Sequence, residues 1–139
     1  MKSFLMKLNG IQPSQLYINS EKLNAVIERI TTGQQIEPIP VKKLGDYIVF
    51  VDGHTRALAA FLNGFSEVPV YWETEDMDWE AYGICVEWCR DEGIGTIADL
   101  QSRIVSNKEY DELWLDRCAK MQKELERNRS AGTPRQIPR

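Results

Sequence analysis

The run Val49–Ala60 (VFVDGHTRALAA) contains the residues best suited to chemistry, and they lie where a strand gives way to a helix. A β-branched stretch breaks at Asp52-Gly53, and an alanine-rich helix follows at once. The first N–H groups of a helix have no partner within it and lie at the positive end of its dipole, so this junction suits a phosphate. Side chains add the His54 imidazole, the Thr55 hydroxyl and the planar Arg56 guanidinium, which grips phosphate oxygens in pairs.

Asp52 is the member of this group that points to catalysis rather than to binding alone. A carboxylate beside a phosphate repels it unless the carboxylate holds a metal ion or a substrate hydroxyl. Each residue also has an ordinary structural interpretation: Asp52-Gly53 as a tight turn or helix cap, Arg56 as half of an ion pair, and the only histidine, His54, as a packed side chain. The crowding of four polar groups into one strand-to-helix turn favours the phosphate site.

The elements that must position this turn follow from the hydrophobic pattern. Strands are predicted at 4–8, 41–44, 47–51 and 68–72, and the two prolines of 36–41 make that segment an edge strand. Gly45-Asp46 predicts a hairpin between 41–44 and 47–51. One helix is predicted from a Ser20 cap to 31–33, and another from Thr55 to Asn63-Gly64. This succession predicts an α+β fold rather than a doubly wound parallel one.

The pattern becomes helical after Trp72, with helices predicted at 77–92, 96–104 and 107–127. Aromatic and apolar side chains recur there at helical spacing, which indicates core packing, with a ligand pocket as the alternative. The predicted organisation is a core over residues 1–73, a helical extension over 74–129 packed on it, and a disordered tail over 130–139.

Composition narrows the classes of function. The chain has 139 residues, of which 42% are hydrophobic and 27% charged, as expected for one soluble folded unit. Its net charge of −4 argues against a duplex-DNA binder, which usually carries a strong basic face. No apolar run approaches the ~20 residues that span a bilayer, and the N-terminus has too short an apolar stretch for a signal peptide, so a cytoplasmic location is predicted.

The three cysteines are Cys85, Cys89 and Cys118. An odd number without a secretion signal argues against a disulfide framework. Cys85 and Cys89 stand one helical turn apart, but a zinc site needs about four ligands. We therefore interpret the cysteines as small core residues.

Three segments together resemble a known superfamily: 36–41 (IEPIPV), 51–60 (VDGHTRALAA) and 64–70 (GFSEVPV). They resemble the ParB/sulfiredoxin superfamily over about residues 3–73. This resemblance implies a small α+β fold that binds a nucleotide at the Gly-x-x-Arg turn.

Three branches of the superfamily differ at this turn. Sulfiredoxins have a catalytic cysteine where this chain has His54, so reduction of sulfinic acids is not expected. Chromosome-partitioning proteins have a turn like Gly-Glu-Arg-Arg that binds CTP ahead of a DNA-binding domain, whereas this chain has His54-Thr55 and an acidic helical part. Free-serine kinases have a turn similar to Asp-Gly-His-Thr-Arg, which is intact here from Asp52 to Arg56.

The resemblance to the kinase branch implies phosphoryl transfer from a nucleotide, ADP or ATP, to a small hydroxyl substrate. Asp52 would bind that hydroxyl or Mg²⁺. The catalytic base would be Glu21, near the start of the first helix, with Glu37 as the other candidate, and each is equally well explained as a surface carboxylate. The phosphates would be cradled by Gly53, His54, Thr55 and Arg56.

A second hypothesis is a non-catalytic, nucleotide-gated binding module related to the chromosome-partitioning proteins. Its turn would sense a nucleotide, CTP included, and its helical extension would engage a protein or DNA partner. DNA binding by this chain alone is not expected, given its negative charge. A transferase needs a carboxylate facing the phosphate, whereas a sensor needs only Gly53, Thr55 and Arg56.

Overall fold

The computed structural model describes residues 2–132, and its central element is a mixed four-stranded sheet in the order β1-β5-β3-β4. β1 runs antiparallel to β5, β5 parallel to β3, and β3 antiparallel to β4. A mixed sheet with separate helices confirms the predicted α+β class. The strands are β1 (Phe4–Lys7), β3 (Ile39–Leu44), β4 (Tyr47–Phe50) and β5 (Glu67–Trp72).

The predicted hairpin is confirmed, because Leu44 pairs with Tyr47 across the Gly45-Asp46 turn. The prediction that 36–41 forms an edge strand is wrong. β3 begins at Ile39 and lies inside the sheet, between β4 and β5. Pro40 has no N–H to donate, but β4 ends at Phe50, so the β3–β4 ladder does not require a donor at this position. The Pro40 carbonyl still accepts a hydrogen bond from the N–H of Val51 at 3.0 Å.

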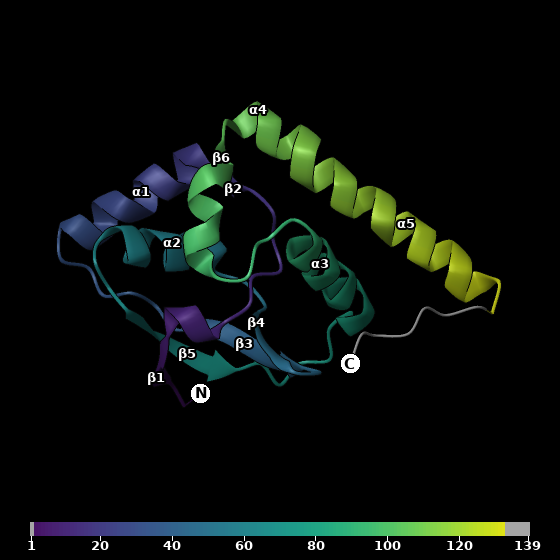
Figure 1. The fold of residues 1–139 in the computed structure, drawn as a ribbon, viewed down its shortest axis with the longest axis horizontal. Helices are drawn as coiled ribbons and strands as arrows, with labels where there is room; N and C mark the ends of the chain where they lie inside the picture. Colours follow the sequence, from purple (N-terminus) through teal and green to yellow (C-terminus); the bar gives the residue numbers. More distant parts are fainter. Residues whose placement is uncertain (1, 133–139) are drawn as a thin grey trace.

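Helices α1 (Ser20–Thr31) and α2 (His54–Leu62) pack side by side above the sheet (Figure 1). Both were predicted, but Asn19 rather than Ser20 caps α1. The Asn19 side-chain oxygen accepts from the N–H groups of Glu21 and Lys22, at 2.9 and 3.2 Å. Asparagine and serine cap equally well, so the sequence alone did not distinguish these two neighbours.

The remaining chain is helical, as predicted. It forms α3 (Trp79–Asp91), a 3₁₀ helix η2 (Ile97–Arg103) capped by Thr96, and a long C-terminal helix. That helix comprises α4 (Asn107–Tyr110), a five-residue π-helical turn η3 (Asp111–Leu115) and α5 (Asp116–Ser130). In Figure 1 it runs from the α1 side of the molecule across α3.

A short parallel pair of strands joins the segment before α1 to the segment before α4. β2 (Ile18–Asn19) pairs with β6 (Ile104–Val105), directly before α1 and α4 respectively. The Asn19 amide also donates to the Asn107 side-chain oxygen at 2.7 Å. The start of the C-terminal helix is thereby fixed beside the start of α1. A segment called η1 (Leu8–Gly10) makes one 3₁₀ turn after β1.

One hydrophobic core joins the sheet, α1 and α2 to the C-terminal helices. Cys85 and Cys89 are buried in it, as predicted, and Cys118 is half-buried. Of the predicted tail, residues 133–139 lie outside the described residues. None of the described helices is both long and apolar enough to cross a bilayer.

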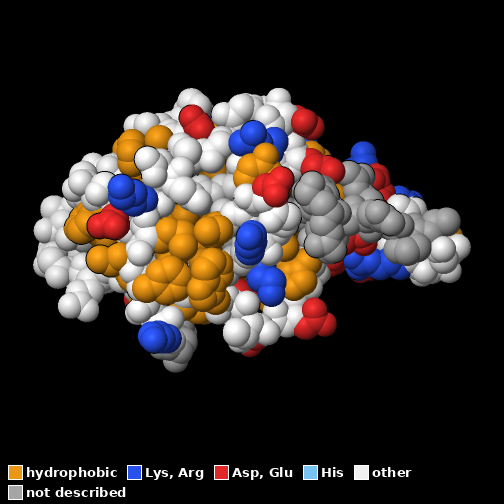
Figure 2. Space-filling view, turned by 60° about the horizontal axis from the view of Figure 1, so that its bottom comes forward, with side chains coloured by type: hydrophobic (Ala, Val, Ile, Leu, Met, Phe, Trp, Pro, Cys, Tyr) orange, Lys and Arg blue, Asp and Glu red, His pale blue; other side chains and the backbone are white. Residues whose placement is uncertain are grey.

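The sheet side of the molecule carries an apolar area. Figure 2 turns that side toward the reader and shows hydrophobic side chains gathered on it. The exposed apolar residues of β1 and its neighbour β5 include Phe4, Leu5 and Trp72, and the Phe4 and Trp72 rings lie 5.7 Å apart.

Candidate functional site

The turn between β4 and α2 depends on Gly53. Its φ of +77° lies in the left-handed region, and a Cβ at this position would stand 2.9 Å from Cγ2 of Ile39. That distance is shorter than real Cβ contacts, so a larger residue would require the Ile39 side chain to shift, besides adopting the strained φ. Gly53 brings the chain from the sheet directly into the first turn of α2.

Gly53→Ala is expected to lower the free energy of unfolding by about 1–3 kcal/mol and to weaken anion binding at the turn. Denaturant unfolding measures the first effect. Gly33→Ala is the matched control, because Gly33 has a φ of +92° but nothing within 4 Å of its Cβ position. Equal losses in the two variants would show that contact with Ile39 does not constrain the turn.

The N-terminus of α2 has no side-chain cap, because its N-cap residue is Gly53. Within the turn, the first backbone bond is from the N–H of Ala57 to the carbonyl of Gly53, at 2.9 Å. The N–H groups before Ala57 therefore point out of the helix end with the positive end of the dipole. This geometry suits an anionic ligand.

A cavity of about 520 Å³ opens at this helix end, between α1 and α2. Three cationic side chains line it, Lys22, Arg29 and Arg56, against two carboxylates, Asp52 and Glu37. The balance of charge inside the cavity is therefore positive although the whole chain is negative. The other lining residues are Gln15, Asn19, Ala25, Val26, Gly53, His54, Thr55 and Tyr110.

Arg56 joins this cavity to a second one. Its Nη1 donates to the carbonyls of Pro38 and Glu37, at 3.1 and 3.4 Å, so the guanidinium holds the segment before β3. The second cavity, of about 340 Å³, shares Val26, Arg29, Glu37 and Arg56 with the first. Its other walls are Ile30, Gln34, Gln35 and Ile36.

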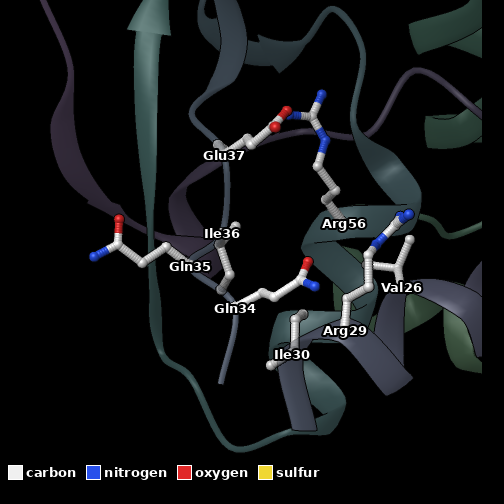
Figure 3. Close-up of a pocket in the computed structure, with 8 residues that line it drawn as sticks. All are labelled: Val26, Arg29, Ile30, Gln34, Gln35, Ile36, Glu37 and Arg56. Carbon is white, nitrogen blue, oxygen red and sulfur yellow. The ribbon is translucent and has the colours of Figure 1, made fainter. Parts of the chain in front are cut away.

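Figure 3 shows Gln34 reaching toward the α1 side chains, whereas Gln35 extends the other way. The apolar walls of this second cavity come from Val26, Ile30 and Ile36. The two cavities are neighbours that share four wall residues, Arg29 and Arg56 among them. Lys22 and the end of α2 belong to the first cavity, and the amides of Gln34 and Gln35 belong to the second.

His54 plays a different part from the one its side chain suggested. The ring is only 3% exposed, packs 5.4 Å from Phe50, and accepts at Nε2 from the N–H of Ser14 at 2.9 Å. Burial lowers the pKa of His54 from 6.5 to about 4, and the nearby Asp52 carboxylate offsets part of this effect. The neutral ring therefore carries its proton on Nδ1, and His54 positions the turn from inside.

This burial predicts a pH dependence of stability. Between pH 6.5 and about 4 the unfolded chain takes up a proton at His54 that the folded chain does not. The free energy of unfolding therefore falls as the pH falls through this window, by up to roughly 3 kcal/mol. Urea unfolding of the wild type should show this fall in the free energy of unfolding below pH 6.5. His54→Gln keeps an acceptor but does not titrate, so its free energy of unfolding should lack the part of the fall that His54 causes. Above pH 6.5 the two proteins should show the same pH dependence.

The proton NMR signals of this single histidine provide a direct check. In the folded protein they should not move until the pH nears 4. A midpoint near 6.5 would contradict the buried, neutral ring.

The two glutamates proposed as catalytic base lie in different places. Glu37 lines both cavities, whereas Glu21 is exposed in the first turn of α1 and is not among the lining residues. The α1 residues that do line the cavity, at 22, 25, 26 and 29, share one helix face. Glu21 precedes Ala25 by one helical turn, so it lies at the edge of this face and outside the residues that line the cavity.

Several lining residues were not predicted. Lys22 and Arg29 stand seven residues apart on one face of α1, a spacing that the sequence shows. Gln15 lies in the loop before α1, and Tyr110 comes from the C-terminal helix, so neither is signalled by local pattern. Asp52 is exposed at the cavity, and its charge contributes to raising the pKa of Tyr110 to about 12, although burial is the larger cause.

Asp52 does not belong to a metal cluster of protein ligands. No group of three or more His, Cys, Asp or Glu residues in the described part of the chain could hold a metal ion. Mg²⁺ nevertheless binds commonly through one or two carboxylates together with ligand phosphates. The donor set here fits only that arrangement.

Comparison with known proteins adds evidence for the fold. No family model and no curated protein sequence matches the chain. Among solved structures, a conserved hypothetical protein from Pyrococcus furiosus is 20% identical, with a TM-score of 0.50 over 56% of this chain and 34% of that one. A glutamate-to-alanine variant of free serine kinase in complex with ADP is 22% identical, with a TM-score of 0.50 over the same shares.

This chain has the ParB/sulfiredoxin-like fold. The predicted resemblance is thus confirmed at the level of the fold. The C-terminally truncated chromosome-partitioning protein ParB from Caulobacter crescentus, complexed with CTP-gamma-S, is 21% identical, with a TM-score of 0.47 over 68% of this chain and 53% of that one. The chain spans about a third of the length of the Pyrococcus protein and of the free serine kinase variant.

Proposed function

We propose that this ParB/sulfiredoxin-like chain binds a nucleotide, with its phosphates at the N-terminus of α2. The observation that carries the proposal is the uncapped helix end, which opens into a cavity lined by Lys22, Arg29 and Arg56. Helix N–H groups and guanidinium groups bind phosphate oxygens by charge-assisted hydrogen bonds. Nucleotides in the complexes of two similarly folded proteins support the choice of ligand.

The second cavity suits the nucleoside end of the same ligand. Its apolar side chains, Val26, Ile30 and Ile36, offer surface for a base, and the Gln34 amide offers a donor and an acceptor. Arg56 stands between the two cavities, bonded to the segment before β3. A nucleotide in this orientation would therefore touch α1, α2 and that segment together.

We further propose that the site transfers a phosphoryl group from ADP or ATP to a small hydroxyl compound, free serine being the first to test. Such a reaction needs chiefly positioning and neutralisation of charge, which the cationic side chains and helix end supply. Mg²⁺, held by Asp52 and the phosphates, would add neutralisation. The oxygen of the acceptor hydroxyl attacks the terminal phosphorus of the nucleotide. The bond between that phosphorus and the bridging oxygen breaks, so ADP leaves when ATP is the donor and AMP leaves when ADP is the donor. The hydroxyl proton passes to a carboxylate.

Glu37 is the carboxylate we assign to that proton, because it lines the cavity and Glu21 does not. Asp52 is assigned to the metal ion or to orienting the hydroxyl. The Arg56 guanidinium, the Thr55 hydroxyl and the backbone N–H groups of Gly53, His54 and Arg56 are assigned to the phosphates. The His54 side chain is assigned to positioning the turn.

The non-catalytic binding module is favoured by one specific observation. Tyr110, at the end of α4, lines the phosphate-side cavity, so a bound nucleotide would touch the C-terminal helix directly. A module that senses nucleotide requires such a contact, whereas catalysis does not. The two functions share the binding site and differ in turnover.

Two measurements test the proposal in order. A panel of nucleotides, with and without Mg²⁺, should raise the melting temperature selectively, because ligands that bind the folded state stabilise it. Phosphorus NMR with ADP or ATP, Mg²⁺ and a pool of amino acids should then reveal a phosphorylated product. Stabilisation without product would favour the binding module, and no stabilisation by any nucleotide would contradict both functions.

A further inference from the structure

A third cavity lies between α3 and α5, and two cysteines face it from opposite helices. Its volume is about 220 Å³. Cys85 comes from α3 and Cys118 from α5, and both line the cavity, together with Trp114 and Met121 from the C-terminal helix. The nucleotide-site proposal does not use either thiol.

The two thiols are neighbours across this cavity. Each thiol is the largest cause of the shift in the other's pKa, and both cysteines are free. Cys85 is only 7% exposed, whereas Cys118 is half-buried. Cys118 is therefore the more accessible residue of the pair.

The surroundings distinguish the two sulfurs chemically. The Cys85 thiol and the neighbouring Arg117 guanidinium lower the pKa of Cys118. The Cys118 thiol and burial raise the pKa of Cys85. A thiolate is the nucleophilic form of cysteine, so Cys118 is the sulfur that attacks.

Cys89 provides the internal comparison. It follows Cys85 by one turn of α3, is fully buried, and its Sγ donates to the carbonyl of Gln15 at 3.6 Å. Burial raises its pKa to about 12. It does not line the cavity that Cys85 and Cys118 share.

We propose that Cys85 and Cys118 form an oxidisable dithiol, which a hydroperoxide converts into an intrachain disulfide between α3 and α5. The Cys118 thiolate attacks one oxygen of hydrogen peroxide, the O–O bond breaks, and Cys118 becomes a sulfenic acid, while the departing hydroxide takes up the proton that the thiol released and becomes water. The Cys85 thiol then attacks that sulfur, the S–S bond forms, and a second water leaves. The thiols lose two electrons and two protons in all, and the peroxide takes them up.

The disulfide would fix the C-terminal helix to α3 at mid-length. The far end of that helix is already held there, because Arg129 bonds Asp78 and Glu80 at 2.8 and 2.9 Å. The near end is fixed by the bond between Asn19 and Asn107, and it supplies Tyr110 to the phosphate-side cavity. With the disulfide added, the helix would be held at both ends and in the middle.

The test is to treat the reduced, full-length protein with hydrogen peroxide and then count free thiols and measure the intact mass. The wild type should fall from three free thiols to one, with the mass of two hydrogens lost and no dimer on a non-reducing gel. A dithiol reductant should restore all three. Peptide mapping should show the 85–118 cross-link.

Serine variants make the test specific. Cys89→Ser should form the same cross-link and lose both remaining thiols, whereas Cys85→Ser and Cys118→Ser should form no intrachain disulfide. Far-UV circular dichroism confirms that each variant is folded. The proposal is overturned if folded wild type gives only sulfinic acid or intermolecular disulfides, or if Cys85→Ser cross-links as well as the wild type.

Discussion

Asp52→Asn is expected to reduce phosphoryl transfer by at least about a hundredfold while nucleotide binding is retained or tightened. The carboxylate lines the cavity beside the proposed phosphate site, where its charge would oppose the phosphates. Asparagine keeps the shape and removes the charge, so it relieves that repulsion and abolishes the role of Asp52 toward metal ion or hydroxyl. Phosphorus NMR gives turnover, and calorimetry gives the affinity.

Asp46→Asn is the matched control, because Asp46 lies in the β3–β4 turn, outside the cavity residues. It should leave turnover and affinity unchanged. Equal turnover in wild type and Asp52→Asn would remove Asp52 from the mechanism. A large loss of affinity without Mg²⁺ would show that the carboxylate supports the turn rather than the reaction.

Arg56→Ala is expected to weaken nucleotide binding by about 1.5–3 kcal/mol, the range for hydrogen bonds that involve a charged group. This corresponds to a rise in Kd of about ten- to a hundredfold, measured by calorimetry. Arg56 serves both cavities, and its bonds to Pro38 and Glu37 also place the segment that separates them.

Two further variants separate these contributions. Arg56→Lys keeps the charge but loses the planar fork, so its affinity should fall between wild type and Arg56→Ala. Arg127→Ala, in the exposed last part of α5, should bind like the wild type. If Arg56→Ala binds as tightly as Arg127→Ala, the phosphates do not lie at this turn.

The sequence predicted the turn and the helix that follows it, because both depend on residues close together in the chain. The Asp52–Arg56 turn, the start of α2 and its end at Asn63-Gly64 depend on local backbone preferences, and each was confirmed within a residue or so. Gly53 illustrates why: its left-handed φ and the closeness of the Ile39 side chain make any other residue strained there. Local signals of this kind are visible without knowledge of the fold.

Features set by tertiary packing were harder to predict. The position of β3 inside the sheet depends on β5, which pairs with it in parallel from far along the chain. The face of α1 that meets the cavity depends on how the helix is turned against α2, which placed Lys22 rather than Glu21 there. Tyr110 reaches the site only through the β2–β6 pair and the bond between Asn19 and Asn107.

At His54, one feature follows from the local sequence and another from tertiary packing. Its place in the turn was predicted, but the direction of its ring was not, because the partner that decides it, the N–H of Ser14, lies 40 residues away. The His54 ring fills the core beneath the turn. The sequence predicted that this side chain would donate to phosphate, but it holds the turn in place instead. Sequence spacing shows which groups share a turn, but not which of them turn inward.

The most direct test of the central claim is a titration of isotopically labelled protein with ADP, followed by backbone amide NMR. If phosphates bind at the N-terminus of α2, the amide signals of Gly53, His54, Thr55 and Arg56 should shift saturably, while that of Gly45, in the β3–β4 turn, stays in place. Shifts that fail to appear at millimolar ADP, ATP and CTP, or that gather elsewhere and spare these four amides, would contradict the account.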